Sequence, residues 1–181
     1  MNPMMTPKEQ EFFAQILNRK PNQAYLEYGA GGSTVWACNC NNIQSVTSVE
    51  VDKDWIENIK KQDLRIKPQF FNPGYSHKGL SVPINNTEKD KWELFSSGIN
   101  GLFDVVLVDG RFRVACAAYA YDLLKEDGVM LIHDYKEDRL EYYNIEKLYN
   151  ILHKVDALIS VKKITGTDNK QLWREFKHSW L

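Results

Sequence analysis

The sequence has few cysteines, no long apolar run and no excess of charge of one sign. Its three cysteines are an odd number without metal-finger spacing, so neither a disulfide framework nor a zinc finger is expected. The 23 basic and 24 acidic side chains leave a formal net charge of −1, which argues against a protein held to nucleic acid or to a membrane surface by bulk charge. No apolar run approaches the roughly 20 residues that a membrane span needs. The first thirteen residues lack the basic and apolar regions of a signal peptide, so we expect reduced thiols and a cytoplasmic protein.

What the sequence contains is typical of a folded globular protein. Hydrophobic residues make up 43% and aromatic residues 12% of the 181 positions, too much for a disordered chain. The length fits one domain over residues 1–181, and no internal repeat, low-complexity tract or linker divides it. The sequence carries no indication of an oligomeric state.

Strand and helix patterns alternate along the chain about five times. Strands are predicted over 24–28, 43–50, 69–71, 103–108, 129–132, 157–164 and 171–177. Helices are predicted to begin near Thr6, Ser33, Asp52 and Thr87, and to span 111–124 and 138–152. This alternation predicts an α/β fold: a doubly wound, mostly parallel seven-stranded sheet with helices on both faces. The last two strands flank the turn Gly166 to Asn169, which predicts a C-terminal antiparallel hairpin.

An acidic residue stands at the end of each of the four clearest strands. These are Glu27, Glu50, Asp109 and Asp134. One such acid alone often caps a helix or begins a turn. In a doubly wound sheet, however, ligands bind outside the carboxyl ends of the strands, so the four carboxylates are expected to crowd a binding edge.

A glycine-rich turn follows the first strand, at Gly29, Gly31 and Gly32. A dinucleotide fingerprint needs a third glycine where this chain has Thr34, and a phosphate-binding P-loop needs a lysine that the turn lacks. Glu27 just before the turn would repel a pyrophosphate. The turn therefore favours a ligand with positive charge and no phosphate, such as S-adenosylmethionine, although a simple strand-to-helix turn is the alternative. Glu50, at the end of the next strand, is placed to accept both ribose hydroxyls.

Two pairs of segments resemble known methyltransferases. The run Tyr25–Thr34 together with Ser48–Asp52 resembles the first two motifs of class I S-adenosylmethionine-dependent methyltransferases. The stretches Phe103–Cys116 and Leu131–Tyr135 narrow the resemblance to a methyltransferase-like subgroup, distantly similar to plant glucuronoxylan 4-O-methyltransferases. The general resemblance covers about residues 22–153 and implies a Rossmann-like fold.

Carried over to this sequence, the resemblance implies a cofactor site and a catalytic site. The cofactor residues are Glu27, Tyr28, Gly29, Ala30, Gly31, Ser33, Thr34, Glu50, Val51, Asp109 and Gly110. The catalytic residues are Asp109, His133 and Asp134.

Neighbouring strands lie about 5 Å apart, so Asp109 and Asp134 are also within reach of one Mg²⁺ or Mn²⁺. Related metal-dependent enzymes add Asn or Glu beside the second acid, whereas this chain offers His133 or Tyr135, and histidine suits Mn²⁺ better. Without a metal, His133 or Asp109 is the candidate general base. The alternative for His133 is a hydrogen-bonded histidine of the core.

Three further residues are candidates for binding the substrate. Arg111 and Arg113 follow the strand-end acid, where they are predicted either to recognise an acidic or hydroxyl-rich substrate or to pair with nearby acids. His77 lies in the long patternless stretch 72–86, which is predicted to form a lid or a wall for a sugar.

These features together predict an S-adenosylmethionine-dependent O-methyltransferase. The favoured acceptor, a sugar or glycan hydroxyl, is implied by the distant family resemblance alone. A small-molecule, catechol-like acceptor is the alternative within the same class. A nicotinamide-dependent oxidoreductase and an inactive Rossmann-like interaction module are the other hypotheses; Thr34 and Glu27 argue against the first, and the intact turn and acids against the second.

Overall fold

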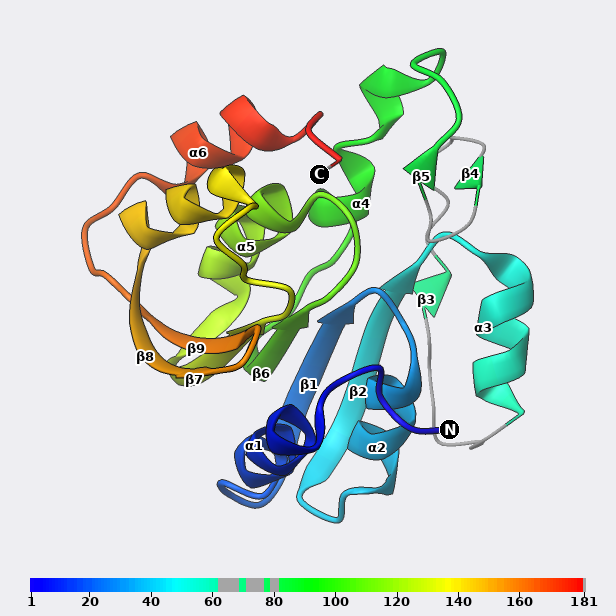
Figure 1. Cartoon of the computed structure of the whole chain (residues 1–181), viewed down its shortest axis with the longest axis vertical. Helices are drawn as coiled ribbons and strands as arrows, with labels where there is room; N and C mark the ends of the chain where they lie inside the picture. Colours follow the sequence, from blue (N-terminus) through cyan, green and yellow to red (C-terminus); the bar gives the residue numbers. More distant parts are fainter. Residues whose placement is uncertain (62–68, 71–76, 79–81, 181) are drawn as a thin grey trace.

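The computed structural model describes residues 1–61, 69–70, 77–78 and 82–180 (Figure 1). Its main sheet has the strand order β3-β2-β1-β6-β7-β9-β8. The strands are β1 (Gln23–Tyr28), β2 (Ile43–Glu50), β3 (Gln69–Phe70), β6 (Phe103–Val108), β7 (Leu124–Ile132), β8 (Tyr149–Val155) and β9 (Leu158–Lys163). The helices are α1 (Pro7–Leu17), α2 (Gly32–Asn39), α3 (Lys53–Lys60), η1 (Lys89–Lys91), α4 (Leu94–Ser97), α5 (Arg113–Leu123), η2 (Leu140–Lys147) and α6 (Asn169–Phe176).

The central strands are parallel, which confirms the predicted Rossmann-like α/β class. β1 pairs in parallel with both β2 and β6, and β6 pairs in parallel with β7. β9 and β8 then run antiparallel at one end of the sheet. The chain leaves β1 on one side to build β2 and returns on the other to build β6, so the switch point lies between β1 and β6, at their carboxyl ends.

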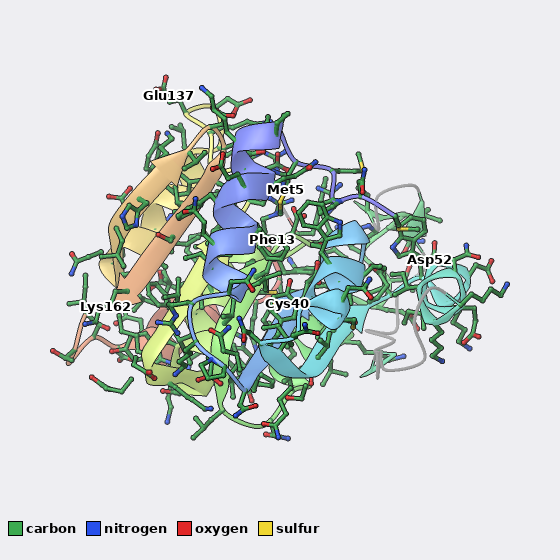
Figure 2. The ribbon with its side chains drawn as sticks, turned by 90° about the horizontal axis from the view of Figure 1, so that it is seen from below. Met5, Phe13, Cys40, Asp52, Glu137 and Lys162 are labelled. Atoms are coloured by element: carbon green, nitrogen blue, oxygen red, sulfur yellow. The ribbon has the colours of Figure 1, made fainter. Side chains whose placement is uncertain are left out.

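Successive residues of the central strands point to opposite faces, and each face has its own apolar core. Leu26 and Tyr28 of β1 belong to the core beneath α4, α5, η2 and α6, whereas Tyr25 belongs to the core beneath α1 and α2. Figure 1 shows these two helix layers on opposite sides of the sheet. Figure 2 shows α1 and α2 side by side on their face, with Met5 and Phe13 between them. The two faces of the sheet are therefore covered by helices, as predicted, and the carboxyl ends of the strands are the expected binding edge.

The predicted C-terminal hairpin is wrong in its position. The segment 171–177 is not a strand: it lies in α6, which begins after Asp168, whose carboxylate accepts a hydrogen bond of 3.0 Å from the Gln171 N–H. Leu172 and Phe176, four residues apart, face the core of the sheet from this helix. The turn-like composition of 166–169 suggests a hairpin. A helix forms there because Asp168 caps it and because Leu172 and Phe176 have helical spacing.

The hairpin that the structure contains joins β8 and β9, one element earlier than predicted. The helix predicted over 138–152 ends early: only Leu140–Lys147 is helical, as a 3-10 helix, and Tyr149–Val155 is strand β8. Leu148 and Ile151 have helical spacing, but Ile151 is 38% exposed because β8 is an edge strand with a mostly solvent-facing surface.

The patternless stretch 72–86 is described only in part. β4 (His77–Lys78) pairs antiparallel with β5 (Val82–Pro83). The side chain of His77 and most of the predicted lid lie outside the described residues. In the parts that the structure describes, no helix combines the length and the apolar composition needed to cross a membrane.

Candidate functional site at the strand ends

The glycine turn links the end of β1 to α2 and is tightly packed on two sides. Gly29 has a φ of +96°, and a Cβ there would lie 2.7 Å from the backbone of Gly110, which follows β6. A Cβ at Gly32 would lie 2.2 Å from the backbone oxygen of Asn2, so the start of the chain packs on the turn. Beside Gly31 the nearest atom is Ser33 Oγ at 3.9 Å. The turn therefore presents open backbone at Gly31 and excludes side chains at its two ends.

Glu27 lies beneath this turn and is fully buried. Its carboxyl group accepts hydrogen bonds from the hydroxyls of Ser33, Thr34 (2.6 Å) and Tyr25 (3.1 Å). Thr34 in turn accepts a bond of 2.9 Å from the Gly31 N–H, so the carboxyl group organises the first turn of α2. Burial raises the pKa of Glu27 to about 8, although these three hydroxyls oppose the shift. Contact between Glu27 and a cofactor stays a prediction.

Glu50, at the end of β2, is bonded to backbone on two sides. One oxygen accepts from the N–H groups of Val51 (2.7 Å) and Asp52 (3.1 Å), and the other accepts from Ala30 in the glycine turn (3.1 Å). Trp55 on α3 donates its indole N–H to the Ala30 carbonyl at 2.6 Å. Burial raises the pKa of Glu50, while the three backbone N–H groups oppose that shift. The second strand and α3 thus hold the turn from the side where a ribose is expected.

Asp109 and His133 lie at the ends of the neighbouring strands β6 and β7. Asp109 Oδ1 is 2.9 Å from His133 Nδ1. The Asp109 side chain is 23% exposed, whereas His133 is 10% exposed and stands behind it. Burial lowers the pKa of the imidazole, but the bond to Asp109 and the charges of Asp109, Asp134 and Glu9 outweigh it, so the pKa of His133 is raised.

Arg113, the first residue of α5, joins the two strand ends. Its guanidinium donates to the carbonyls of Gly110 (2.8 Å), Asp109 (3.2 Å) and His133, and to the Asp134 carboxylate (3.1 Å). The residue is only 6% exposed. Arg113 therefore supports the two strand ends from within the protein. Its ion pair with Asp134 agrees with one of the two predictions made for it, pairing with nearby acids. Recognition of a substrate by the half-buried Arg111 stays a prediction.

Asp134 lies on the other side of Arg113, with its side chain 26% exposed. It pairs with Arg113 at 3.1 Å, Lys136 at 3.2 Å and Arg139 at 4.0 Å. Burial raises the pKa of its carboxyl group, but Arg113, His133 and Lys136 outweigh it, so the pKa of Asp134 is lowered. Each of Asp109, His133 and Asp134 offers one metal-ligand atom, and these atoms all lie within 4.8 Å of one another.

The structure thus gathers most of the sequence-predicted residues at one edge of the sheet. The side chain of Tyr28 does not lie at this edge. Its ring is fully buried in the core, and its hydroxyl donates to the Ser96 carbonyl at 3.0 Å. Two contributors are missing from the sequence-based site, Trp55 on the glycine turn and Glu9 of α1, whose Oε2 lies 3.5 Å from His133 Nε2. The capping pattern at Thr6 and Glu9 predicts the start of α1, but nothing in that pattern predicts a contact 124 residues away.

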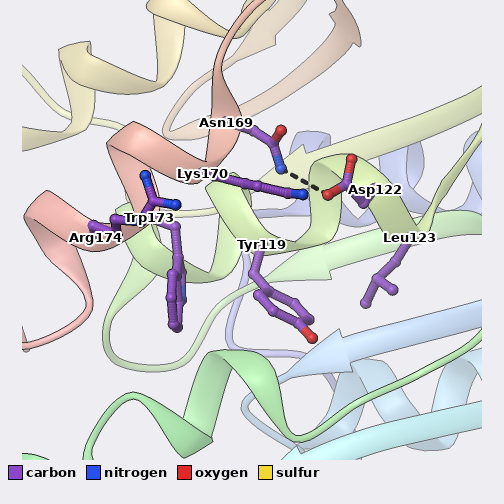
Figure 3. A pocket seen from close by; sticks show the side chains of 7 residues that line it. All are labelled: Tyr119, Asp122, Leu123, Asn169, Lys170, Trp173 and Arg174. Atoms are coloured by element: carbon purple, nitrogen blue, oxygen red, sulfur yellow. Dashed lines mark hydrogen bonds between the residues drawn. The ribbon is translucent and has the colours of Figure 1, made fainter.

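A cavity of about 260 Å³ lies between α5 and α6 (Figure 3). It is lined by Tyr119, Asp122, Leu123, Asn169, Lys170, Trp173 and Arg174. The α5 residues come from the second half of that helix, whereas the strand-end site lies at its first residue. This cavity is therefore separate from the strand-end site.

Comparison with known proteins bears on the fold. No protein-family model matches the chain, and no curated protein matches its sequence. A methyltransferase-like protein from Silicibacter pomeroyi is similar in structure, with a TM-score of 0.80 over 98% of this chain and 97% of that protein at 22% identity. NodS, an N-methyltransferase from Bradyrhizobium japonicum in complex with S-adenosyl-L-homocysteine, is similar with a TM-score of 0.54 over 87% and 88% at 12% identity. A TehB-like S-adenosylmethionine-dependent methyltransferase from Corynebacterium glutamicum gives a TM-score of 0.52 over 84% and 87% at 12% identity.

The chain has the fold of S-adenosylmethionine-dependent methyltransferases.

Proposed function

We propose that the protein is an S-adenosylmethionine-dependent O-methyltransferase that methylates a hydroxyl of a sugar or glycan. The observation that carries the proposal is the juxtaposition at the switch point: an open glycine turn, with Glu50 on one side and the Asp109–His133 pair on the other. The sugar acceptor is supported by the distant sequence resemblance to glucuronoxylan 4-O-methyltransferases. We also propose that it acts in the cytoplasm on a small-molecule or glycan acceptor, independently of nucleic acid and membranes, as composition and charge predict.

The residues around the turn fit this cofactor. A bound nucleoside would lie against Gly31, where the backbone of the turn is open. The turn from Gly29 to Thr34 contains no lysine or arginine that could bind a phosphate. Glu50 would accept the ribose hydroxyls, because its carboxyl group is already held beside the turn by the N–H groups of Ala30, Val51 and Asp52. The cofactor supplies a methyl group on a sulfonium, which one in-line displacement transfers.

The residues at the ends of β6 and β7 prepare the acceptor. A sugar hydroxyl is a poor nucleophile near pH 7, so it needs a group that takes its proton. The Asp109 carboxylate is the candidate, since its side chain reaches the surface while His133 lies behind it. Arg113 fixes the geometry by binding the backbone on both strand ends, and Asp134 completes the polar wall. Such positioning accounts for several kcal/mol of a displacement barrier.

A divalent metal is a separate part of the proposal. Asp109 and Asp134, with His133 beside them, are the residues that would hold Mn²⁺ or Mg²⁺ and so lower the pKa of a bound hydroxyl. The cation competes with Arg113 and Lys136, which already pair with Asp134. Activity that EDTA abolishes and Mn²⁺ restores would support the metal. Full activity in EDTA would contradict the metal requirement, and the Asp109 carboxylate alone would then take the proton of the acceptor hydroxyl.

Isothermal titration with S-adenosylhomocysteine, S-adenosylmethionine and NAD⁺ tests the cofactor. We expect micromolar binding of the first two ligands and none of NAD⁺. Glu50→Ala should weaken binding at least about tenfold, which is about 1.4 kcal/mol. Glu57→Ala is the matched control, because it removes an exposed glutamate from the nearby helix α3. If the protein binds NAD⁺ but neither S-adenosylhomocysteine nor S-adenosylmethionine, the oxidoreductase hypothesis is favoured. If the folded protein binds none of the three ligands, the interaction module is favoured.

A panel of methyl glycosides, including a methyl glucuronide, and of catechols then tests the acceptor. We expect transfer of a labelled methyl group to a glycoside. Transfer to catechols alone would replace the sugar with a small aromatic acceptor and would leave the methyltransferase assignment intact.

A further inference from the structure

Glu9, in the first turn of α1, is a buried carboxylate at the edge of the strand-end site. The residue is 2% exposed. One of its oxygens accepts a hydrogen bond of 2.8 Å from the Thr6 N–H, and the other accepts 2.8 Å from the Ala157 N–H in the turn between β8 and β9. Glu9 Oε2 also lies 3.5 Å from His133 Nε2. The carboxylate therefore touches three segments that are distant in the sequence.

His133 stands between two carboxylates as a result. Its Nδ1 faces Asp109 at 2.9 Å, and its Nε2 faces Glu9 at 3.5 Å. The Nδ1 contact is a hydrogen bond, and the Nε2 contact is an ion-pair distance to a carboxylate oxygen. A carboxylate on each edge of the ring opposes its rotation about the bond to Cβ. His133 therefore lies between Glu9 of α1 and Asp109 at the end of β6.

We propose that Glu9 is a positioning residue of the active site, which fixes the His133 ring so that the ring holds the Asp109 carboxylate toward the acceptor hydroxyl. This inference rests on the proposed methyltransferase function and adds a residue from α1 to it. Carboxylates that orient a metal-ligating histidine commonly change metal affinity or activity by about 10–100-fold when removed, and we expect the same range for a histidine that orients a carboxylate.

Glu9 also caps α1, so its two roles have to be separated. Thr6 and Glu9 form a reciprocal capping box, in which the Thr6 hydroxyl accepts from the Glu9 N–H at 3.3 Å. Thr6 also donates to the Asp156 carboxylate at 2.6 Å. Thr6→Ala removes the hydroxyl that caps α1 and bonds Asp156 in the turn between β8 and β9, but it leaves the Glu9 carboxylate with Ala157 and beside His133. It is therefore the matched control for a purely structural effect.

The experiment compares Glu9→Gln and Thr6→Ala with the wild type. For each variant, kcat and KM are measured with the methyl glycoside that the wild type uses best, and the Kd of S-adenosylhomocysteine is measured by titration. We expect Glu9→Gln to lower kcat by about 10–100-fold with the Kd unchanged within about twofold, because the loss is in positioning and not in cofactor binding. We expect Thr6→Ala to keep kcat within about threefold of the wild type. Equal losses of kcat in both variants would overturn the proposal.

Nuclear magnetic resonance of the ¹⁵N-labelled histidine rings gives a second readout that needs no acceptor. In the wild type we expect His133 to carry a proton on Nε2, and we expect Glu9→Gln to change its ring nitrogen shifts while Thr6→Ala leaves them in place. A wild-type His133 without a proton on Nε2 would overturn the role of Glu9, even where Glu9→Gln does not fold. If no methyl transfer is found but the ring signature is as expected, the proposed function fails and the positioning contact stands.

Discussion

Replacement of Glu27 by glutamine should change how the stability of the protein depends on pH. Burial raises the pKa of this carboxyl group from 4.5 to about 8 in the folded protein. Between those two values the folded chain holds a proton that the unfolded chain releases, so the free energy of unfolding falls as pH rises, by up to about 1.4 kcal/mol per pH unit. From pH 5.5 to 7.5 this amounts to about 2.5 kcal/mol, because the folded chain begins to lose the proton near pH 7.5. Glutamine does not titrate, and its amide oxygen still accepts a bond from Ser33 or Thr34.

The assay is urea denaturation followed by tryptophan fluorescence at pH 5.5, 6.5 and 7.5. We subtract the free energy of unfolding of the wild type from that of Glu27→Gln at each pH. This difference should rise by about 2.5 kcal/mol from pH 5.5 to 7.5, because only the wild type loses stability through this group. Glu11→Gln corrects for the loss of one carboxyl group, since it removes an exposed glutamate from α1. A difference that stays constant to within about 0.5 kcal/mol would refute the reasoning, because it would mean that Glu27 is ionised when folded.

Three further substitutions test the supports of the turn and of the strand ends. Gly29→Ala should lower the free energy of unfolding by at least about 2 kcal/mol in urea, because φ is +96° and its Cβ would lie 2.7 Å from Gly110; a change below about 0.5 kcal/mol would contradict the tight approach. Arg113→Ala should cost about 3–5 kcal/mol in the same assay, since it removes a buried guanidinium with four hydrogen bonds and leaves Asp134 without that partner. Trp55→Phe should weaken binding of S-adenosylhomocysteine about fivefold in a titration, because it removes about 1 kcal/mol of hydrogen bonding to Ala30; unchanged affinity would show that this bond does not shape the turn.

Alternation along the chain was enough to predict the parallel centre of the sheet. The run Phe103–Val108 is apolar at almost every position, and all six residues are buried, as expected for a strand covered by helices on both faces. The C-terminal third was harder, because short segments such as 149–155 mix apolar and polar residues in a way that suits a helix and an edge strand equally. The structure of such a segment depends on what it pairs with. Residues 149–155 form a strand because they pair antiparallel with β9, and hydrophobic periodicity carries no information about that contact.

The candidate site was predictable to the same extent. Strand-end acids share an edge by topology alone, so the proximity of Asp109 and Asp134 follows from the strand order. What each side chain does at that edge depends on distant partners. The sequence leaves Arg113 between binding a substrate and pairing with nearby acids. Its bonds to backbone carbonyls and to Asp134 show the second role, and substrate binding stays a prediction. Glu9 enters the site only because α1 packs across the ends of β7 and β9.

The arginine at the start of α5 also has a consequence for how this scaffold can diversify. Three of its four hydrogen bonds go to main-chain oxygens, those of Asp109, Gly110 and His133, and every amino acid supplies such an oxygen. Substitutions at positions 109 and 133 therefore change the side chains at this edge while these main-chain bonds keep the spacing of the two loops. A substitution of Asp109 also removes its 3.4 Å ion pair with Arg113. An engineer can vary the acid, the base or a ligand for a different acceptor there, and should leave Arg113 untouched. One residue, Arg113, thus holds the two loops together, and the side chains that these loops present can be changed separately.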